Sequence, residues 1–133
     1  MNRTLLLVKP DATERNLEDE ILDIIRDNGF RIIRSRREKM NRQKAERFYA
    51  VHSDKDFFNG LIDYMTSGET LGVILESDNA VEKLRELIGD TDPHEADPDS
   101  IRGRYGQTLR RNSVHGSDCN QSAKHEIEVF FKE

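Results

Sequence analysis

The residues best suited to chemistry in this 133-residue chain lie at positions 112–118, which read N-S-V-H-G-S-D. His115 is followed by Gly116, and a helix can begin at the serine or aspartate that comes next. A helix N-terminus offers unpaired N–H groups and about half a positive charge, and a glycine allows close approach to the backbone. Imidazole acts as an acid, a base or a nucleophile near pH 7. The segment therefore suits a phosphate held on or near His115, although a single histidine beside a turn is also commonly structural.

Charge is distributed unevenly along the chain, whose net charge is −5. Residues 89–99 include five acids and no Lys or Arg, whereas residues 100–119 include four arginines and one acid. A local basic segment in an acidic protein suits a small anionic ligand better than a polymer. The overall charge, and the lack of an R-G-F-G-F type strand, disfavour nucleic acid as the primary partner.

Composition limits the compartment and the class of protein. Apolar residues make up 35% of the chain and never run for more than four positions, so no membrane span of about 18 residues is expected. The N-terminal residues lack a long apolar run and a small-residue cleavage site, so no secretory signal is expected. A single cysteine excludes an intramolecular disulfide or a cysteine-based zinc cluster. The P-loop, G-x-G-x-x-G, protein-kinase and H-E-x-x-H motifs are also missing. We expect a cytoplasmic protein with one domain over residues 1–133 and a thin core that favours self-association.

The spacing of apolar residues predicts an α+β fold. We expect strands at 3–9, 30–40, 70–76 and 127–131, and helices at about 16–28, 41–51, 57–66, 78–88 and 118–126. The stretch from about 89 to 112 has little periodicity and two prolines, which is typical of a long functional loop. Apart from one extra helix and this loop, the order is the βαββαβ pattern of a ferredoxin-like sandwich with an antiparallel four-stranded sheet.

Several short motifs follow one another in a characteristic order. They are K-P-D at 9–11, a tyrosine at 49 followed eight residues later by F-F at 57–58, Y-M-T-S-G at 64–68, T-D-P at 91–93, I-R-G at 101–103 and N-S-V-H-G-S-D at 112–118. In this order and spacing they resemble the nucleoside diphosphate kinases over essentially the whole chain. The set is far more specific than any one motif alone.

The resemblance implies a ping-pong reaction with low base specificity. The γ-phosphate of a nucleoside triphosphate, typically ATP, would pass to a nucleoside diphosphate through a phosphohistidine at Nδ1 of His115. Lys9 and Tyr49 would contact the terminal phosphate. Glu126 would orient His115 through the other ring nitrogen, with Ser117 assisting.

The same resemblance implies how a nucleotide is held. Arg85, Thr91 and Arg102 would bind the α- and β-phosphates, and Lys9 and Asn112 would meet the sugar hydroxyls. Phe57 and Leu109 would stack on the base from opposite sides, which tolerates many bases. Mg²⁺ would arrive with the nucleotide, held by phosphates and water without a protein ligand. The family assembles as homo-oligomers, so a hexamer or a tetramer is expected, with no membrane partner.

Four of these residues also have simpler explanations when each is taken alone. Lys9 can equally be a solvated cation at a strand end, and Phe57 a core residue. Arg85 can pair with nearby glutamates on a helix surface, and Tyr49 can be a packed aromatic. Two other classes of protein also remain open: a nucleotide-binding module without catalysis on the same fold, and an RNA-binding sheet of this topology.

Other histidines and the cysteine match no catalytic position of the family. His52, His94 and His125 are predicted to lie on the surface. Cys119 is predicted to be a small residue at a helix start, open to oxidation but not a nucleophile.

The chain departs from the family pattern outside the catalytic residues. Glu69 replaces a usual proline, and residues 99–100 replace a usual Gly-Thr. Arg104 stands where an acid is common, and Arg110 where a glycine is common. Both arginines lie in the long loop, which in the family shapes the nucleotide site and contacts other subunits, so they leave the packing of that loop and the assembly open.

Overall fold

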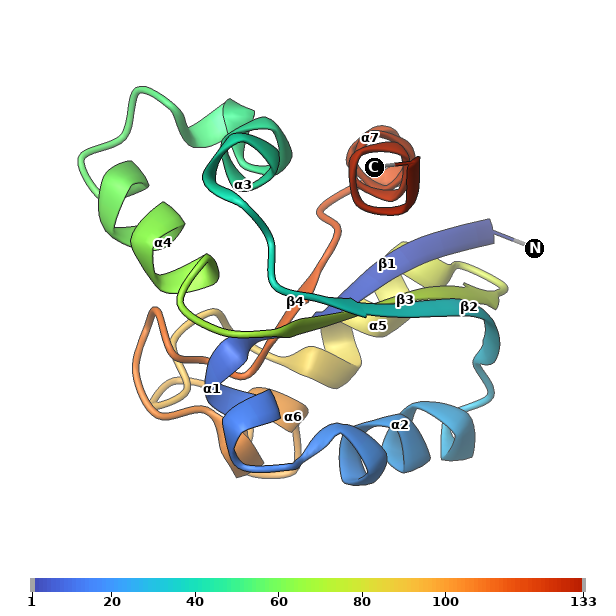
Figure 1. Cartoon of the computed structure of the whole chain (residues 1–133). Coiled ribbons are helices and arrows are strands. Elements are labelled where there is room, and N and C mark those ends of the chain that lie inside the picture. The colour runs from blue at the N-terminus through green and yellow to red at the C-terminus, as the bar shows by residue number, and fades with distance from the viewer. Residues whose placement is uncertain (1, 133) are drawn as a thin grey trace.

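A computed structural model describes residues 2–132 and contains a four-stranded antiparallel sheet (Figure 1). Its strands are β1 (Asn2–Val8), β2 (Arg31–Glu38), β3 (Thr70–Ser77) and β4 (Val114–Gly116). They lie in the order β2-β3-β1-β4, which confirms the predicted ferredoxin-like α+β topology. Because β1 pairs with β4, the end of β1 that leads into Lys9 lies beside the strand that carries His115.

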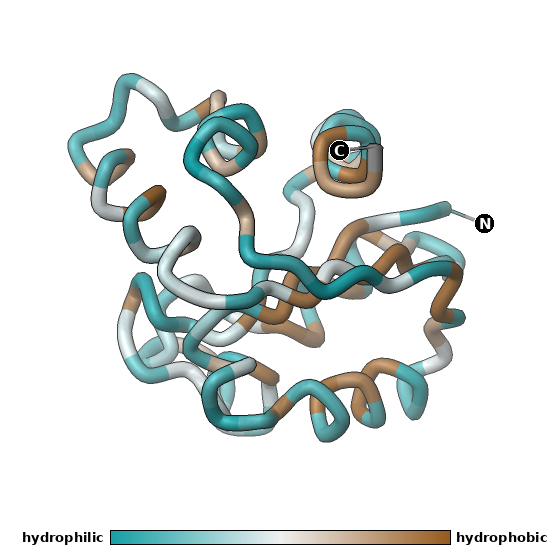
Figure 2. The backbone as a smooth tube through the Cα atoms, in the orientation of Figure 1, coloured by the Kyte–Doolittle hydropathy of each residue, from teal (hydrophilic) through white to brown (hydrophobic). Residues whose placement is uncertain are grey.

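Two helical layers cover the sheet. The helices are α1 (Pro10–Glu14), α2 (Glu18–Asp27), α3 (Arg42–Phe48), the 3-10 turn η1 (Ala50–His52), α4 (Phe58–Met65), α5 (Ala80–Ile88), α6 (Ile101–Tyr105) and α7 (Asn120–Lys132). Helices α3, α4 and α7 pack on one face, and α2, α5 and α6 pack on the other (Figure 1). In α2, for example, the hydrophobic residues recur on the side of the coil nearest the sheet (Figure 2), and Ile21 and Ile25 are buried in the core.

Strand β1 is the centre of both cores. Successive side chains of a strand point to opposite faces, so Leu6 and Val8 enter the core beneath α2 and α5. Leu5 and Leu7 enter the core beneath α3, α4 and α7. All four side chains are fully buried. The short apolar run seen in the sequence is therefore a strand covered on both faces.

The predicted last strand at 127–131 is wrong. These residues continue α7, and the fourth strand is the three-residue β4 inside the histidine motif. Ala123, Glu126 and Phe130 recur at helical spacing and are buried together on one face of α7. A strand of three residues is too short to show a period, and a brief apolar run does not by itself distinguish a strand from a helix.

The long loop also contains a helix that the sequence did not reveal. Helix α6 begins after Ser100, whose Oγ accepts a hydrogen bond from the N–H of Gly103 at 3.1 Å. This side-chain cap satisfies one of the free N–H groups at the helix start. The helix places Arg102 at a fixed position within an otherwise irregular segment.

Lys44 connects α3 to α7. Its side chain is buried, its Nζ lies 2.5 Å from Oε1 of Glu38, and it donates to the carbonyl oxygen of Phe130 at 2.7 Å. Helix α3 leads directly to Tyr49, and α7 carries Glu126. The contact therefore fixes two elements that supply predicted site residues.

We expect Lys44→Met to lower the free energy of unfolding by roughly 2 kcal/mol, because the carbonyl of Phe130 loses its buried cation and the carboxylate of Glu38 keeps only the more exposed Arg36, 3.2 Å away. The matched control is Arg42→Met, which removes an exposed pair with Asp63 2.8 Å away and should cost less than about 1 kcal/mol. Urea unfolding of the two variants measures the difference. Equal losses would show that the Lys44 contact is not the stabilising one.

Candidate active site

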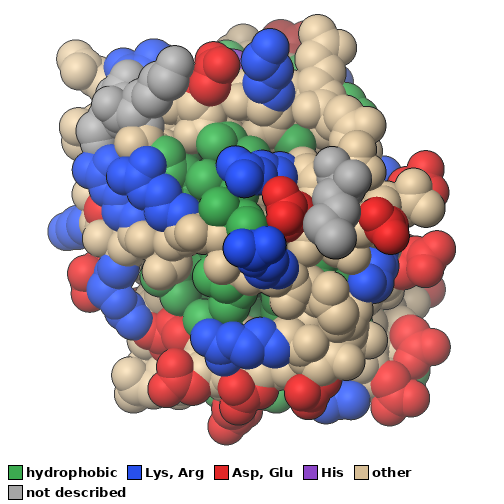
Figure 3. All heavy atoms as spheres, turned by 90° about the vertical axis from the view of Figure 1, so that its right-hand side faces the viewer, with side chains coloured by type: hydrophobic (Ala, Val, Ile, Leu, Met, Phe, Trp, Pro, Cys, Tyr) green, Lys and Arg blue, Asp and Glu red, His purple; other side chains and the backbone are tan. Residues whose placement is uncertain are grey.

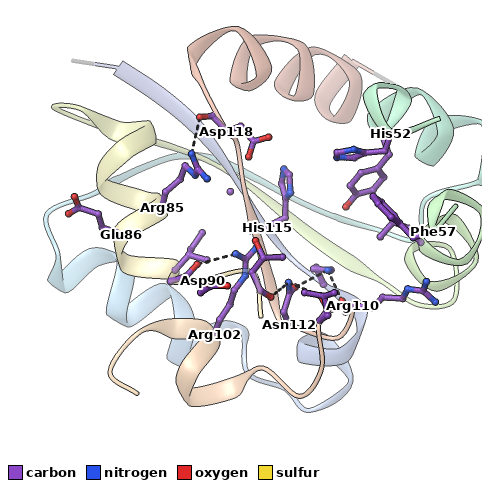
Figure 4. A pocket seen from close by; sticks show the side chains of 18 residues that line it. His52, Phe57, Arg85, Glu86, Asp90, Arg102, Arg110, Asn112, His115 and Asp118 are labelled. Carbon is purple, nitrogen blue, oxygen red and sulfur yellow. Dashed lines mark hydrogen bonds between the residues drawn. The ribbon is translucent and has the colours of Figure 1, made fainter. Parts of the chain in front are cut away.

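A pocket of about 940 Å³ opens at the end of β1 and β4, between the α3–α4 segment and the loop around α6 (Figure 4). The residues predicted to form the site are brought together here from distant parts of the chain. Those that line the pocket are Lys9, Tyr49, Phe57, Arg85, Thr91, Arg102, Leu109, Asn112 and His115. The other two, Ser117 and Glu126, lie behind His115 and contact it or its partner.

His115 is oriented by a carboxylate. Its Nε2 lies 2.8 Å from Oε1 of Glu126, and the hydroxyl of Ser117 donates to the same oxygen at 2.7 Å. Burial alone would raise the pKa of Glu126, but the hydrogen bond and charge of His115, together with Ser117, hold it below the ordinary value. An ionised carboxylate only accepts, so Nε2 carries the proton in the neutral ring and the lone pair is on Nδ1. Nδ1 is then the nitrogen available for chemistry in the pocket.

Aromatic residues pack against the imidazole ring. The rings of Phe48 and Tyr49 meet it edge to face, with centroids 5.5 and 6.1 Å from its own. Tyr49 is buried, and burial followed by the negative charge of Glu126 raises the pKa of its hydroxyl. The hydroxyl therefore remains a proton donor at any physiological pH. Tyr49 is thus both a packed aromatic and a wall of the pocket.

Lys9 is a buried cation and not a solvated one. Its Nζ donates to Oδ1 of Asn112 at 2.9 Å and to the carbonyl oxygen of Arg110 at 2.8 Å. Burial, and then repulsion from Arg102 and Arg110, lowers the pKa of Lys9 to about 7, although Asp11 acts in the opposite direction. Both hydrogen-bond acceptors are uncharged oxygens. An anionic ligand in the pocket would therefore supply the countercharge that the nearest partners lack.

Asn112 holds the two ends of the long loop together. Its Nδ2 donates to the carbonyl oxygens of Thr91 at 2.9 Å and Leu109 at 3.1 Å, while its Oδ1 accepts from Lys9. The next residue, Ser113, has a φ of +76°, which is uncommon outside glycine. This turn lets Asn112 face the loop while the chain enters β4 at Val114, one residue before His115.

Two arginines form a cationic wall. Arg102 donates from Nη1 to the carbonyl oxygen of Gly89 at 3.1 Å and from Nη2 to that of Val114 at 3.0 Å. Burial, with repulsion from Arg85, lowers the pKa of Arg102 to about 10, and its buried Nε has no hydrogen-bond partner. Arg85 is exposed on α5 and has no glutamate partner among the ion pairs of residues 2–132. Both guanidinium groups suit a phosphate ligand.

Apolar side chains mark the opposite end of the pocket. Phe57 is 47% exposed and Leu109 is 62% exposed, although both are large and apolar. Phe57 is therefore not a core residue, and its ring stands beside the imidazole of His52 with centroids 5.6 Å apart. Exposed apolar faces that line a pocket are suited to stacking on a planar ligand.

The prediction for His52 needs a correction. It is half-buried in η1 and lines the pocket, whereas His94 and His125 are exposed as predicted. The available signal was its position three residues after Tyr49, one turn along the chain, but a three-residue 3-10 turn has no visible period. Arg110 and Asp118 also line the pocket and were not predicted as site residues.

Within the described residues, no group of three or more His, Cys, Asp or Glu side chains is arranged to hold a metal ion. The pocket instead gathers cations, which fits phosphates that bring their own divalent ion.

Among the helices that the structure describes, not one combines the length and the apolar character needed to cross a bilayer.

Comparison with known proteins gives one family. The family model described as nucleoside diphosphate kinase matches residues 2–133. A nucleoside diphosphate kinase of Nitratiruptor sp. is 45% identical over 131 residues, covering 98% of this chain and 96% of that protein. Another, of Oleidesulfovibrio alaskensis, is 46% identical over 129 residues and covers 97% and 93%.

Solved structures of the same family have the same fold. The apo nucleoside diphosphate kinase of Encephalitozoon cuniculi superposes with a TM-score of 0.97 at 34% identity, covering 100% of this chain and 90% of the other. The halophilic enzyme of Halobacterium salinarum, in complex with CDP, gives 0.95 at 35% identity and covers 99% and 88%.

The fold and the pocket define a phosphotransferase that acts on nucleotides. The chain belongs to the nucleoside diphosphate kinase family. Enzymes of this family need a divalent cation for activity.

The lowered pKa of Lys9 predicts how stability depends on pH. The folded chain loses this proton near pH 7, whereas the unfolded chain keeps it to about 10.5, so the cost of the buried charge is present below pH 7 and is relieved as pH rises. Relative to Lys9→Met, the wild type should gain stability between about pH 7 and pH 10, by up to about 1.4 kcal/mol per pH unit.

Urea unfolding of both proteins at pH 6, 8 and 10 measures this change. Lys39→Met is the control, because that lysine is exposed, and its stability difference should vary less over the same range. A difference for Lys9→Met that stays constant with pH would show that Lys9 is not held as a costly buried cation.

Proposed function

We propose that this protein transfers the γ-phosphate of a nucleoside triphosphate, typically ATP, to a nucleoside diphosphate through a phosphohistidine at Nδ1 of His115. The contact that carries the proposal is the 2.8 Å hydrogen bond between Nε2 of His115 and Glu126, which leaves Nδ1 as the nucleophile. Neutral imidazole is a good nucleophile near pH 7. The same contact favours a catalyst over a binding module without chemistry.

In the first half-reaction the Nδ1 lone pair attacks the γ-phosphorus, and the bond from phosphorus to the β–γ bridging oxygen breaks. The nucleoside diphosphate leaves with that electron pair, and the ring becomes a phosphorylated imidazolium whose Nε2 proton faces Glu126. In the second half-reaction a terminal oxygen of the acceptor diphosphate attacks the phosphorus. The P–N bond electrons return to Nδ1, and the ring is neutral again.

The barrier to such a transfer is lowered mainly by positioning and by positive charge. Lys9 and the protonated hydroxyl of Tyr49 are proposed to donate to the transferred phosphate, since both line the pocket with His115. A bound phosphate would favour the charged form of Lys9 over the neutral one. Nucleotide binding would therefore favour protonated Lys9 next to the transferred phosphate.

The remaining residues are proposed to hold the nucleotide. Arg85, Thr91 and Arg102 bind the α- and β-phosphates, and Asn112, with Lys9, meets the sugar hydroxyls. The support is their shared position on the pocket wall. The base stacks between Phe57 and Leu109, the two exposed apolar side chains of that wall.

The divalent cation is proposed to be Mg²⁺, held by the nucleotide phosphates and water near the cationic wall. When bound, it neutralises phosphate charge and orients the polyphosphate chain.

We also propose a homo-oligomer, a hexamer or a tetramer, in the cytoplasm. The face beside strand β2 supports self-association, because it presents an apolar area among Lys and Arg side chains (Figure 3). Ile32 and Ile33 of β2 are only partly buried. The cytoplasmic assignment is supported by the single cysteine, Cys119, which is free and exposed.

The carrier role of His115 is tested with γ-labelled ATP and Mg²⁺ in the absence of an acceptor. We expect an acid-labile, base-stable label on the wild type that any nucleoside diphosphate discharges, and no label on His115→Ala. His94→Ala, at an exposed histidine outside the pocket, is the control and should label like the wild type. A label on His115→Ala, or an unlabelled wild type that still binds nucleotide, would reject the mechanism.

Stacking predicts broad acceptor use. Because stacking contacts the face of a base and not its edge, we expect ADP, GDP, CDP and UDP to have KM values within about tenfold of one another. Phe57→Ala should raise all four by roughly tenfold, the scale of one lost stacking contact.

Val51→Ala is the matched control for Phe57→Ala, because Val51 is a 79% exposed apolar residue that does not line the pocket. Steady-state kinetics with each acceptor measure these effects. Strong exclusion of purines or of pyrimidines would mean that Phe57 and Leu109 do not form a simple stacking slot.

A further inference from the structure

The side chain of Arg110 crosses from the long loop to helix α4. A Cβ atom built on Gly60 would lie 2.6 Å from Nη2, 2.8 Å from Nη1 and 2.9 Å from Cζ of Arg110. Real Cβ atoms essentially never approach other atoms that closely. The guanidinium therefore lies directly against the backbone of α4 at Gly60, and a methyl group at residue 60 would displace this exposed end of the Arg110 side chain.

The two ends of this contact belong to the two walls of the base slot. Leu109 directly precedes Arg110 in the loop, and Phe57 is the residue from which α4 begins, three positions before Gly60. Phe57, Leu109 and Arg110 all line the same pocket, and Figure 4 shows the Arg110 side chain reaching toward the side of the pocket that carries Phe57. The contact therefore links the wall that carries Leu109 to the wall that carries Phe57.

The backbone of Arg110 is fixed as well. Its carbonyl oxygen accepts the 2.8 Å hydrogen bond from Nζ of Lys9. The guanidinium, in contrast, has no hydrogen bond or ion pair with any other part of residues 2–132. No ionic partner accounts for its place, so its packing on Gly60 is the contact that holds it.

We propose that Arg110 is a positioning residue that spans the base slot and sets the separation between Leu109 and Phe57. The inference rests on the proposed function, because that function assigns the slot to the nucleobase. The side chains of Phe57 and Leu109 are exposed, and Leu109 lies in a loop. If the contact between Arg110 and Gly60 were lost, ordering these two side chains would use part of the free energy of nucleotide binding. A base slot whose walls are already in place improves the binding of every base. Arg110 also lowers the pKa of Lys9, but a bound phosphate favours the charged form of Lys9, so the phosphorus chemistry at His115 should change little.

The test is a double-mutant cycle on Arg110→Ala and Gly60→Ala, with KM and kcat measured for ADP, GDP, CDP and UDP. Each single variant should raise KM for all four acceptors by a similar factor, roughly fivefold, with kcat within about twofold of the wild type. Gly60→Ala changes no pocket-lining side chain, and alanine is favourable within a helix. In the Arg110→Ala background the three atoms nearest to its methyl group are gone, so the double variant should be no worse than Arg110→Ala alone.

Arg104→Ala is the matched control. Arg104 lies in the same loop region and is exposed, but it donates to the carbonyl oxygen of Asp99 and does not line the pocket. Its KM values should equal those of the wild type. Arg110→Lys, which keeps the length and charge but not the flat guanidinium, should give KM values between those of wild type and Arg110→Ala.

Three results would overturn the proposal. The first is an unchanged KM in folded Arg110→Ala. The second is a rise confined to acceptors with a particular base edge, which would indicate a direct hydrogen bond to the base. The third is full additivity of the two substitutions. Labelling of the wild type with γ-labelled ATP separates failure of the Arg110 proposal from failure of the proposed function. A wild type that is labelled, and that a nucleoside diphosphate discharges, follows the phosphohistidine mechanism whatever the role of Arg110.

Discussion

The burial of Lys9 at the end of β1 is the constraint to which the rest of the site conforms. A buried ammonium group is costly unless hydrogen bonds and an opposite charge compensate it. The fold supplies two neutral acceptors for the Lys9 ammonium group, Oδ1 of Asn112 and the carbonyl oxygen of Arg110. It adds another cation nearby, Arg102, and this lowers the pKa of Lys9 further. The free chain therefore carries an electrostatic cost that a bound phosphate would remove, which makes the folded state itself selective for anions.

Asp11 compensates Lys9 only in part, because its carboxylate is engaged by a buried network and makes no hydrogen bond with Lys9. The side chain of Asp11 accepts hydrogen bonds from the hydroxyl of Tyr64, from Arg15 at 3.2 Å and from the hydroxyl of Ser113 at 3.2 Å. Arg15 also donates to Ser113 at 3.1 Å. The same contacts therefore engage the carboxylate and stabilise Ser113 in its left-handed conformation. That conformation in turn separates Asn112, which faces Lys9, from His115 on β4.

The sequence predicted which residues lie together better than it predicted the elements that carry them. The motif spacing identified residues that the pocket brings together, because the residue types themselves carry the chemistry. It placed the last strand at 127–131, because an Ile-Glu-Val-Phe-Phe run resembles a strand when its neighbours in space are unknown. The contact of Glu126 with His115 depends on α7 turning back over β4, which no local pattern encodes. His52 and Arg110 were missed for the same reason, since the pocket surrounds them only after distant segments have packed.

The two helical layers supply different groups to the proposed site. Helices α5 and α6 lie on one face of the sheet and supply Arg85 and Arg102, the cations of the phosphate end. The segments on the other face supply Tyr49, Phe57 and Glu126. His115 stands on β4, which is the edge strand where the layers separate. Its ring can therefore meet a carboxylate from one layer while Nδ1 meets a phosphate bound by the other. The proposed low base specificity agrees with this arrangement, because Phe57, on which the base is proposed to stack, lies at the opposite end of the pocket from Arg85 (Figure 4).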